Sequence, residues 1–293
     1  MNSITLSNEA LVLRCRAQGG AVLSLATRSG IAILRPARDP LAPPGECALF
    51  PMLPLANRVE GNAFNWRGRT ITFPRSPWDE RFFLHGDGWL SAWTVADSAP
   101  DAVAFSLSRT LTDICRYRAQ LSYQLRDHAL LATLSITNTD AQPFPFGLGF
   151  HPFFCKTPAM TLWFQARGYW PERAHHLPAD WREEVPSGWD FATPRLPGAG
   201  WMNNAFSGWT GRAVLHDAGS GATVTLDSAT DILMVYQPQN SDFICLEPQT
   251  HPVNAHNQPG MPGLAVLAPG GTLRLAMRIG WAGTTARRRS SPG

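Results

Sequence analysis

The stretch Ala119-Gln-Leu-Ser-Tyr-Gln-Leu125 decides the fold class, together with Leu130-Leu-Ala-Thr-Leu-Ser-Ile136, which follows it closely. Apolar residues occupy every odd position of the first stretch and every even position of the second. Successive side chains of a β-strand point to opposite faces, so this period of two predicts strands that are buried on one face. The polar break Asp127-His128 lies between them. We therefore expect an antiparallel β-hairpin.

Strand-like segments of the same character recur along the chain, and no amphipathic helix longer than about three turns accompanies them. Gly19-Gly20 separates the first two segments and predicts a hairpin turn. Many short strands without intervening helices predict an all-β fold, either a sandwich or a barrel. The segments are Leu11–Arg16, Ala21–Thr27, Val103–Arg109, Ala222–Leu226, Ile232–Tyr236, Phe243–Leu246 and Leu273–Ile279.

The composition excludes several other classes of protein. The chain has 25 Gly and 25 Pro among 293 residues, whereas the two together average about 12%. Both residues disfavour long helices, which excludes coiled coils and helical bundles. Hydrophobic residues make up 44% of the chain, and no G-X-Y period is present, so collagen and wholesale disorder are excluded. Residues 35–45 and 178–200 are rich in Pro, Gly and Ala, and we expect them to be irregular surface segments. Because similar strands continue on both sides, we predict a single domain over residues 1–285.

Charge and cysteine content predict a cytoplasmic protein without nucleic-acid or membrane partners. The formal net charge is +3, and Arg287-Arg288-Arg289 supplies three positive charges within residues 286–293, a predicted disordered tail. The remainder is near neutral, unlike a nucleic-acid-binding domain. It is compatible with a monomer or a weak homodimer. Neither a signal-peptide pattern nor an apolar run of membrane-spanning length is present. Five widely spaced cysteines predict reduced thiols.

The common cofactor and nucleophile motifs are absent. The sequence has no P-loop, no G-x-G-x-x-G, no G-x-S-x-G, no H-E-x-x-H and no C-x-x-C. His175-His176 and the pair His251 and His256 have no recognised metal-ligand spacing. We expect these four to be surface or loop histidines, and we expect neither a cofactor nor a metal.

Two polar residues stand where a strand should be apolar. His151 interrupts the aromatic run 144–154, and Glu247 ends the run 243–247. Each precedes a proline, which biases it toward extended backbone. Apolar surroundings raise the pKa of a carboxyl group and make it a better proton acceptor near neutral pH, whereas histidine exchanges protons there with little tuning. On neighbouring strands, the two would form a general acid/base pair.

Each of these features alone also has a purely structural explanation. A lone histidine in an aromatic strand is commonly a core residue, and a glutamate before proline commonly ends a strand. Arg58 fits a surface salt bridge, and Leu84–Gly88 fits a turn. The tryptophans of the chain are more commonly core residues than ligand platforms.

Taken in order, the motifs are more specific. They are Asn57-Arg58-Val59-x-Gly61-x-x-Phe64-x-Trp66-x-Gly68, Leu84-His85-Gly86, Gly149-Phe150-His151-Pro152-Phe153-Phe154, Glu247-Pro248-Gln249-Thr250-His251-Pro252 and Val266-Leu267-Ala268-Pro269-Gly270-Gly271. From about residue 10 to 280, the chain resembles the aldose 1-epimerase (galactose mutarotase) family, in particular its shorter bacterial members. The resemblance implies a large antiparallel β-sandwich, the galactose mutarotase-like supersandwich, with a sugar site in a cleft on its concave face.

The resemblance also implies roles for individual residues. Glu247 matches the general base that takes the proton of the C1 hydroxyl, and His151 matches the general acid that protonates the ring oxygen. Arg58 and His85 match residues that hydrogen-bond the sugar, and Gln237 matches a further polar contact. No cofactor is implied.

The sequence departs from the family pattern at one position. Asn203 stands where a Leu-Asp-x-x-Phe stretch commonly places an aspartate that binds sugar hydroxyls. An amide lacks the charge that strengthens such a hydrogen bond, so we expect a different sugar preference and tighter hexose binding in an Asn203→Asp variant. Trp89 is the candidate platform for the C–H face of a sugar.

Three rival functions remain open. A hexose-6-phosphate 1-epimerase would need additional arginines, for which Arg67, Arg69, Arg75 and Arg81 are candidates, but the near-neutral charge disfavours it. A non-catalytic sugar binder is disfavoured because both His151 and Glu247 are present. A cupin-like metal enzyme would use His85, His151 and Glu247 as ligands, but the sequence lacks an H-x-H pair that would support it. We therefore predict a cofactor-independent isomerase whose partner is a small-molecule aldohexose.

Overall fold

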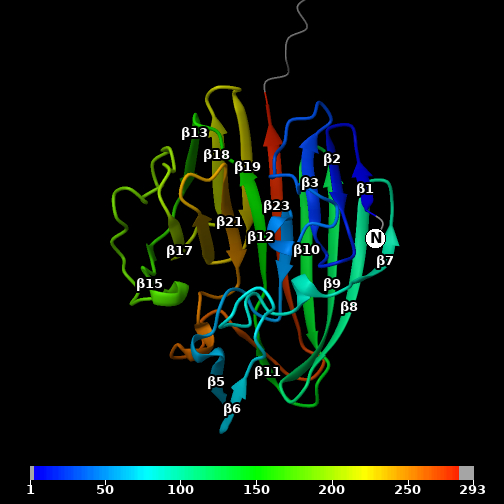
Figure 1. Ribbon diagram of the computed structural model, residues 1–293, viewed down its shortest axis with the longest axis vertical. Helices are drawn as coiled ribbons and strands as arrows, with labels where there is room; N and C mark the ends of the chain where they lie inside the picture. The colour runs from blue at the N-terminus through cyan, green and yellow to red at the C-terminus, as the bar shows by residue number, and fades with distance from the viewer. Residues whose placement is uncertain (1–2, 284–293) are drawn as a thin grey trace, which may run out of the picture.

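The computed structural model describes residues 3–283, and the tail predicted for residues 286–293 lies outside the described residues. The chain forms two large sheets in which every strand pairing is antiparallel (Figure 1). The first has nine strands in the order β1 (Ile4–Ser7), β2 (Leu11–Cys15), β3 (Val22–Thr27), β4 (Leu49–Met52), β12 (Gly149–Cys155), β21 (Phe243–Gln249), β20 (Ile232–Gln237), β17 (Met202–Ser207) and β14 (Gly168–Tyr169). The second has eight strands in the order β13 (Met160–Phe164), β18 (Arg212–Asp217), β19 (Ala222–Ser228), β23 (Thr272–Ala282), β10 (Ala129–Asn138), β9 (Cys115–Arg126), β8 (Ala102–Leu111) and β7 (Thr94–Ser98).

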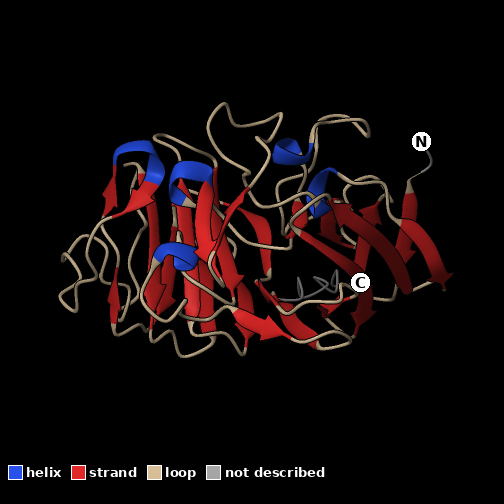
Figure 2. Cartoon of the chain, turned by 90° about the horizontal axis from the view of Figure 1, so that it is seen from below, coloured by secondary structure: helices blue, strands red, loops and turns tan. Residues whose placement is uncertain are grey.

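Short elements complete the architecture, and Figure 2 shows that the helices are short pieces among the strands and loops. Three two-stranded sheets pair β5 (Ala63–Trp66) with β6 (Arg69–Thr72), β11 (Phe144–Phe146) with β22 (Ala265–Leu267), and β15 (Glu172–Arg173) with β16 (Leu177–Pro178). The helices of residues 3–283 are single 3₁₀ turns, and none is long and apolar enough to cross a bilayer. They are η1 (Pro44–Glu46), η2 (Glu60–Asn62), η3 (Gly88–Leu90), η4 (Ala174–His176) and η5 (Ala255–Asn257).

The hairpin that decides the fold class is confirmed as β9 and β10. Their register pairs Leu121 with Leu134 and Leu125 with Leu130, so the alternating apolar side chains of both strands face the same side. Asp127 adopts left-handed backbone at the turn, with φ 51°. The strands β2 and β3 also pair, and Gly19 between them has φ 72°. A Cβ at Gly19 would lie 2.5 Å from the carbonyl oxygen of Trp89, which excludes any larger residue there.

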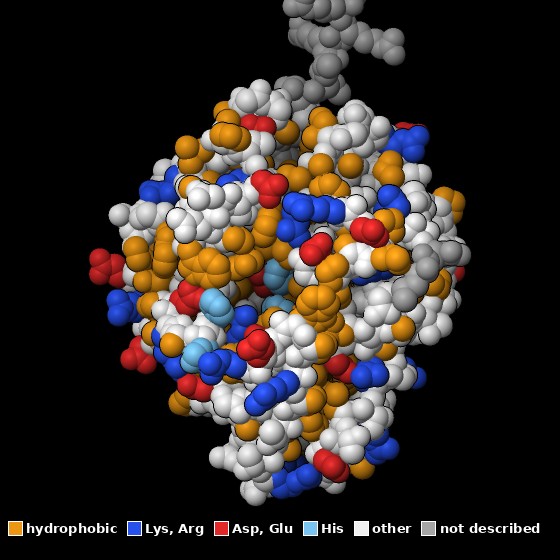
Figure 3. All heavy atoms as spheres, in the orientation of Figure 1, with side chains coloured by type: hydrophobic (Ala, Val, Ile, Leu, Met, Phe, Trp, Pro, Cys, Tyr) orange, Lys and Arg blue, Asp and Glu red, His pale blue; other side chains and the backbone are white. Residues whose placement is uncertain are grey.

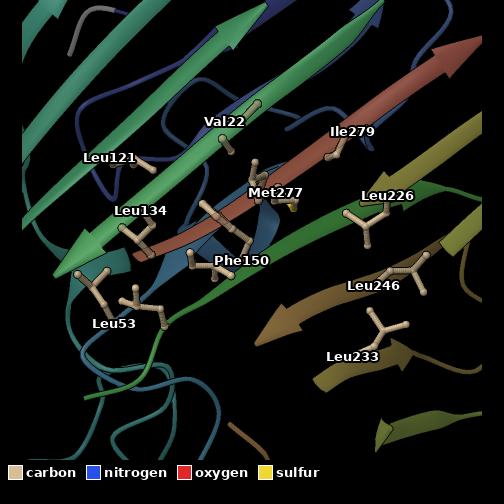
Figure 4. Packing of buried hydrophobic residues seen from close by; sticks show 14 of the residues in the cluster. Val22, Leu53, Leu121, Leu134, Phe150, Leu226, Leu233, Leu246, Met277 and Ile279 are labelled. Atoms are coloured by element: carbon tan, nitrogen blue, oxygen red, sulfur yellow. The ribbon is translucent and has the colours of Figure 1, made fainter. Parts of the chain in front are cut away.

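The core lies between the two large sheets (Figure 4). Leu134 and Ile279 come from the eight-stranded sheet, whereas Phe150 and Leu246 come from the nine-stranded sheet, and all four are at most 1% exposed. The all-β antiparallel sandwich is therefore confirmed. Of the two segments expected to be irregular, 35–45 and 178–200, residues 35–43 and 179–200 lie outside the named strands and helices, whereas Gly45 belongs to η1 and Pro178 to β16.

Strand alternation assigns the other face of the nine-stranded sheet to the candidate site. Phe150 of β12 and Leu246 of β21 belong to the core between the sheets. Their neighbours His151 and Glu247 must point the opposite way, because successive side chains of a strand alternate. The two polar residues that interrupt apolar strands therefore share one face, away from the main core.

The prediction of surface or loop histidines holds only in part for His251 and His256. Both lie in the connection between β21 and β22, outside any strand, but they are only 1% and 3% exposed. Nε2 of His251 accepts the backbone N–H of Ala56 at 3.0 Å, so this ring helps to hold the segment that leads into Arg58. His256 packs against Phe64, and neither of its ring nitrogens has a hydrogen-bond partner among residues 3–283. The five cysteines are free, as predicted.

The burial of His256 has a consequence for stability. Burial lowers the pKa of His256 from 6.5 to about 3. Below pH 6.5 the unfolded chain binds a proton that the folded chain does not, so His256 reduces stability by about 1.4 kcal/mol for each pH unit between 6.5 and its folded pKa. We expect His256→Phe to stabilise the protein at pH 8 by about 1–3 kcal/mol, because two unpartnered polar atoms are removed. The gain should be larger at pH 5.

Urea unfolding at the two pH values measures this difference. His128, at an exposed turn, provides the matched control. We expect His128→Phe to leave the free energy of unfolding at pH 8 within about 0.5 kcal/mol of the wild type, as exposed substitutions usually do. If the stability advantage of His256→Phe over the wild type were the same at pH 5 as at pH 8, His256 would not resist protonation in the folded state.

Candidate active site

A cavity of about 270 Å³ opens on the outer face of the nine-stranded sheet, over β12 and β21. Figure 3 shows the hollow, with histidine side chains at its base and apolar side chains around it. Sites for drug-sized ligands occupy roughly 300–1,000 Å³, so this cavity suits a small ligand. Six of the seven predicted site residues line it, namely Arg58, His85, Trp89, His151, Asn203 and Glu247.

His151 and Glu247 lie directly across from one another on paired strands. The register of β12 and β21 joins Gly149 to Gln249 and Phe153 to Cys245, which sets His151 opposite Glu247. Nε2 of His151 lies 3.1 Å from Oε1 of Glu247, within hydrogen-bonding distance. This direct contact at the base of the cavity follows from the strand register alone.

The apolar surroundings of the pair favour the uncharged form of each group. Glu247 is 1% exposed, and burial raises its pKa from 4.5 to about 8, even though Nε2 of Gln249 and the charge of Arg58 favour the carboxylate. Burial lowers the pKa of His151 from 6.5 to about 3. The imidazole stacks on Phe50 of β4 and on Phe153, with ring centroids 4.5 and 4.6 Å away, and the three rings form one cluster. Burial therefore favours the form of the pair in which Glu247 carries the proton and His151 is neutral.

His85 presents a hydrogen-bond donor to the cavity. Its Nδ1 accepts the backbone N–H of Asn57 at 3.1 Å, so the neutral ring carries its proton on Nε2. Burial lowers the pKa of His85 well below 6.5, which keeps the ring neutral. Gly86, at φ 71°, follows immediately, and a Cβ there would lie 2.1 Å from the carbonyl oxygen of Leu53. This close approach fixes the turn that points His85 into the cavity.

Arg58 supplies positive charge to the wall of the cavity and forms an ion pair with Asp79. Its Nε lies 3.4 Å from Oδ2 of Asp79, and its Nη1 donates to Oδ1 of Asn57 at 3.1 Å. The backbone carbonyl of Arg58 accepts the N–H of Asn254, which ties this segment to the loop after β21. Arg58 is therefore held by several contacts and directs its charge toward Glu247.

The tryptophan predicted as a sugar platform is buried. Trp89 is 3% exposed, stacks on Phe50 at 4.9 Å, and donates from Nε1 to the carbonyl oxygens of Leu84 and Gly86. It supports the base of the cavity and holds the turn at His85. Trp201 also lines the cavity and is 41% exposed, so it offers the more accessible indole face.

Gln237 is placed differently from the expectation. It is 0% exposed, its Nε2 donates to the carbonyl oxygens of Gly198 and Gly200, and its Oε1 accepts from Lys156. The register of β17 and β20 explains why, since it pairs Asn203 with Tyr236 and not with Gln237. Residues that pair across strands share a face, and the next residue points away. Gln237 therefore anchors the loop before β17, and Tyr236 lines the cavity.

Several residues of the cavity escaped the sequence analysis. Tyr236 could have been found from strand alternation, because it lies one residue from Gln237. Phe153 lies two residues after His151 and shares its face. His176 and Trp201 come from irregular segments, where no period predicts which side chain points inward.

The possible metal ligands named from the sequence, His85, His151 and Glu247, are not the set of ligand atoms that the fold brings together. Ligand atoms of His151, Cys245 and Glu247 lie within 4.8 Å of one another, and His85 is not part of that set. Burial raises the pKa of the Cys245 thiol well above 9.0 and that of Glu247 to about 8. Both would have to release a proton before binding a cation. These residues therefore suit proton transfer better than metal binding.

Comparisons with known proteins agree with this fold and cavity. The family model "Aldose 1-epimerase" matches residues 2–280. The chain belongs to the aldose 1-epimerase family, a family of isomerases. "Uncharacterized protein YphB" of Escherichia coli K12 is 34% identical over 294 residues, covering 96% of this chain and 100% of that protein.

Solved structures are similar over almost the whole chain. The crystal structure of a "Putative aldose 1-epimerase" from Escherichia coli K12 has a TM-score of 0.91 and 32% identity, covering 96% of this chain and 99% of that one. A galactose mutarotase-like protein from Clostridium acetobutylicum has a TM-score of 0.86 and 19% identity, covering 96% and 95%, and shows the shared fold.

Proposed function

We propose that this protein is a cofactor-independent aldose 1-epimerase that interconverts the α and β anomers of a free aldohexose. The observation that carries the proposal is the pair formed by His151 and Glu247, 3.1 Å apart at the base of a cavity of about 270 Å³. Anomer exchange needs one group that accepts the proton of the C1 hydroxyl and one that donates a proton to O5, and both of these oxygens are bonded to C1, so two neighbouring groups can serve them. Family membership supports the reaction class.

The reaction follows from the pair without any other reagent. The Glu247 carboxylate takes the proton of the C1 hydroxyl, and the His151 imidazolium donates a proton to O5. The C1–O5 bond breaks as the C1 oxygen becomes a carbonyl, giving the open-chain aldehyde. Rotation about C1–C2 exposes the other face of the carbonyl, and ring closure reverses both transfers. Protons and electrons balance over the cycle.

The pKa shifts match one half of this cycle. With the open-chain aldehyde bound, the pair holds its proton on Glu247 and leaves His151 neutral, the form that burial favours. The cyclic sugar requires the charged form. The positive charge of Arg58 lowers the pKa of Glu247 and so favours that form. The Nε2–H of His85 is a further donor for a sugar oxygen.

The charges of the wall support a neutral sugar over a sugar phosphate. Arg58 lines the cavity and is paired with Asp79. Arg35 lies beside the cavity, where its guanidinium stacks on Phe153 and Phe243 and donates to the carbonyl oxygens of Gly45 and Cys47. Arg67 and Arg69 line a separate surface cleft beside Trp66. A phosphate group would need arginine donors that are free to bind it.

An anomerisation screen tests the proposed function. Freshly dissolved α-glucose, α-galactose and their 6-phosphates are followed by NMR with and without the protein. We expect a faster approach to anomeric equilibrium for at least one free aldose, and a smaller effect on the phosphates. Acceleration confined to the 6-phosphates would overturn the assignment of a neutral substrate.

The protonation of the pair predicts an unusual pH profile. Activity requires one proton on the pair, so kcat/KM, which reports the pKa values of the free enzyme, should stay flat between about pH 5 and 7. It should fall above about pH 8, where Glu247 loses its proton while His151 is already neutral. Initial anomerisation rates, corrected for the buffer reaction at each pH, measure the profile. A fall from pH 7 to pH 5 would mean that His151 titrates as an ordinary histidine.

A further inference from the structure

One carboxylate behind the cavity wall binds three of the side chains that line it. Glu172 of β15 accepts from Nδ2 of Asn203 at 2.6 Å and from Nδ1 of His176 at 2.5 Å through Oε1. Its Oε2 accepts from Nε1 of Trp201 at 2.6 Å. The three donors line the cavity, whereas Glu172 itself is not among the lining residues. Glu172 therefore acts on any ligand only through these neighbours.

The contacts of Glu172 fix the orientation of the Asn203 amide. Burial alone would raise the pKa of the Glu172 carboxyl, but hydrogen bonds from Asn203, His176 and Trp201 lower it below 4.5. An ionised carboxylate only accepts hydrogen bonds, so the amide must turn its NH₂ group toward it. With the amide turned the other way, Oδ1 of Asn203 would lie 2.6 Å from Oε1 of Glu172, and the two acceptors would repel one another. Oδ1 of Asn203 is left with no hydrogen-bond partner among residues 3–283.

We propose that Glu172 is a positioning residue that makes Asn203 a pure acceptor for one sugar hydroxyl and thereby sets which aldose the site takes. The inference rests on the proposed function and extends it. An aspartate at position 203 would place its negative charge in the cavity. Here the negative charge is on Glu172, which contacts Asn203 and does not line the cavity. The wall accepts a hydroxyl donor, and it repels a carboxylate or phosphate at the same position.

Because Glu172 lies beside Asn203, the Asn203→Asp substitution should weaken hexose binding instead of tightening it. From the sequence alone, an aspartate should tighten hexose binding. In the structure, the new carboxylate would lie where Nδ2 now meets Oε1 of Glu172 at 2.6 Å. Two like charges at that distance repel one another and disrupt the wall. We expect KM to rise about tenfold or more, the loss of roughly one charge-assisted hydrogen bond, with a smaller change in kcat.

Exchanging the two groups should restore the site. In Glu172→Gln, one amide oxygen faces three donors, so at least one of them loses its partner, and KM should rise about tenfold. In the double variant Glu172→Gln/Asn203→Asp, the amide introduced at position 172 donates to the carboxylate introduced at position 203. We expect its KM to lie within about threefold of the wild type, a coupling that only direct interaction explains.

Glu60→Gln is the matched control. Glu60 lies at the surface, and its Oε2 accepts from Arg173, the neighbour of Glu172 in β15, at 2.7 Å and more weakly from Nδ2 of Asn254 at 3.3 Å. If KM depended only on how β15 is held, removing the charge of Glu60 would raise KM as much as removing that of Glu172. We expect Glu60→Gln to leave KM unchanged, and an equal rise in the two variants would overturn the proposal.

The experiment measures KM and kcat for glucose and, by calorimetry, the affinity for 1,5-anhydroglucitol, a ring that cannot open. Parallel losses in KM and in affinity for the single variants, with recovery in the double variant, support the role of Glu172. Single variants that match the wild type, or a double variant worse than either, overturn it. A wild-type protein that binds the anhydro sugar without anomerising glucose contradicts the proposed function alone, and the binding series still decides the role of Glu172.

Discussion

Replacing Glu247 with glutamine is expected to lower kcat for anomerisation by about 10²- to 10⁴-fold, the contribution typical of a positioned general acid or base. The amide has nearly the same shape as the carboxyl group but accepts no proton from the C1 hydroxyl. Burial already favours the uncharged form at this position, so the variant should fold as well as the wild type. KM should change much less than kcat. Polarimetry on freshly dissolved sugar at enzyme saturation measures kcat.

The same exchange at Glu60 provides the control for this variant too. Its carboxylate forms an exposed ion pair with Arg173, and such pairs contribute little, so kcat should stay within about twofold of the wild type. A Glu247→Gln variant with less than about a tenfold loss would show that Glu247 is not the proton acceptor.

Replacing His151 with phenylalanine is the second large effect that we expect. The new ring would keep the contacts with Phe50 and with Phe153, whose centroids lie 4.5 and 4.6 Å from the imidazole, so packing should be preserved. The Nε2 atom that meets Glu247 is lost, and with it the proton donor to O5. We expect kcat to fall by about 10²- to 10⁴-fold, measured as for Glu247→Gln.

His256→Phe controls for the chemical change itself. It makes the same exchange at another buried histidine that packs on an aromatic ring and does not line the cavity. Its kcat should match that of the wild type. If the two phenylalanine variants lost activity equally, general disturbance of the fold would explain both, and the assignment of His151 would fail.

The regular parts of the fold could be predicted because their signals are local. The alternation in β9 and β10 marks the strands, and the polar break between them marks the turn. The positions of His151 and Glu247 on one face also follow from alternation, since the residue before each of them, Phe150 or Leu246, belongs to the core. Their contact could not be derived this way, because it depends on the register between strands almost a hundred residues apart.

The remaining site residues depend on geometry that no local pattern contains. The sequence singled out Gln237, whereas its neighbour Tyr236 lines the cavity, because in a strand a single step reverses the direction of the side chain. Glu172 reaches Asn203 across an irregular segment of the chain, where no periodicity applies. The burial of His251 and His256 follows from the loop after β21 folding back onto the Ala56 backbone.

The most direct test of the account follows the optical rotation of freshly dissolved α-glucose and α-galactose, with wild-type protein, with the Glu247→Gln variant and with buffer alone. The account predicts that the wild type shortens the approach to anomeric equilibrium for at least one of these sugars, and that Glu247→Gln remains close to the buffer rate. Equal rates in all three samples, for these and for other common aldoses, would contradict it.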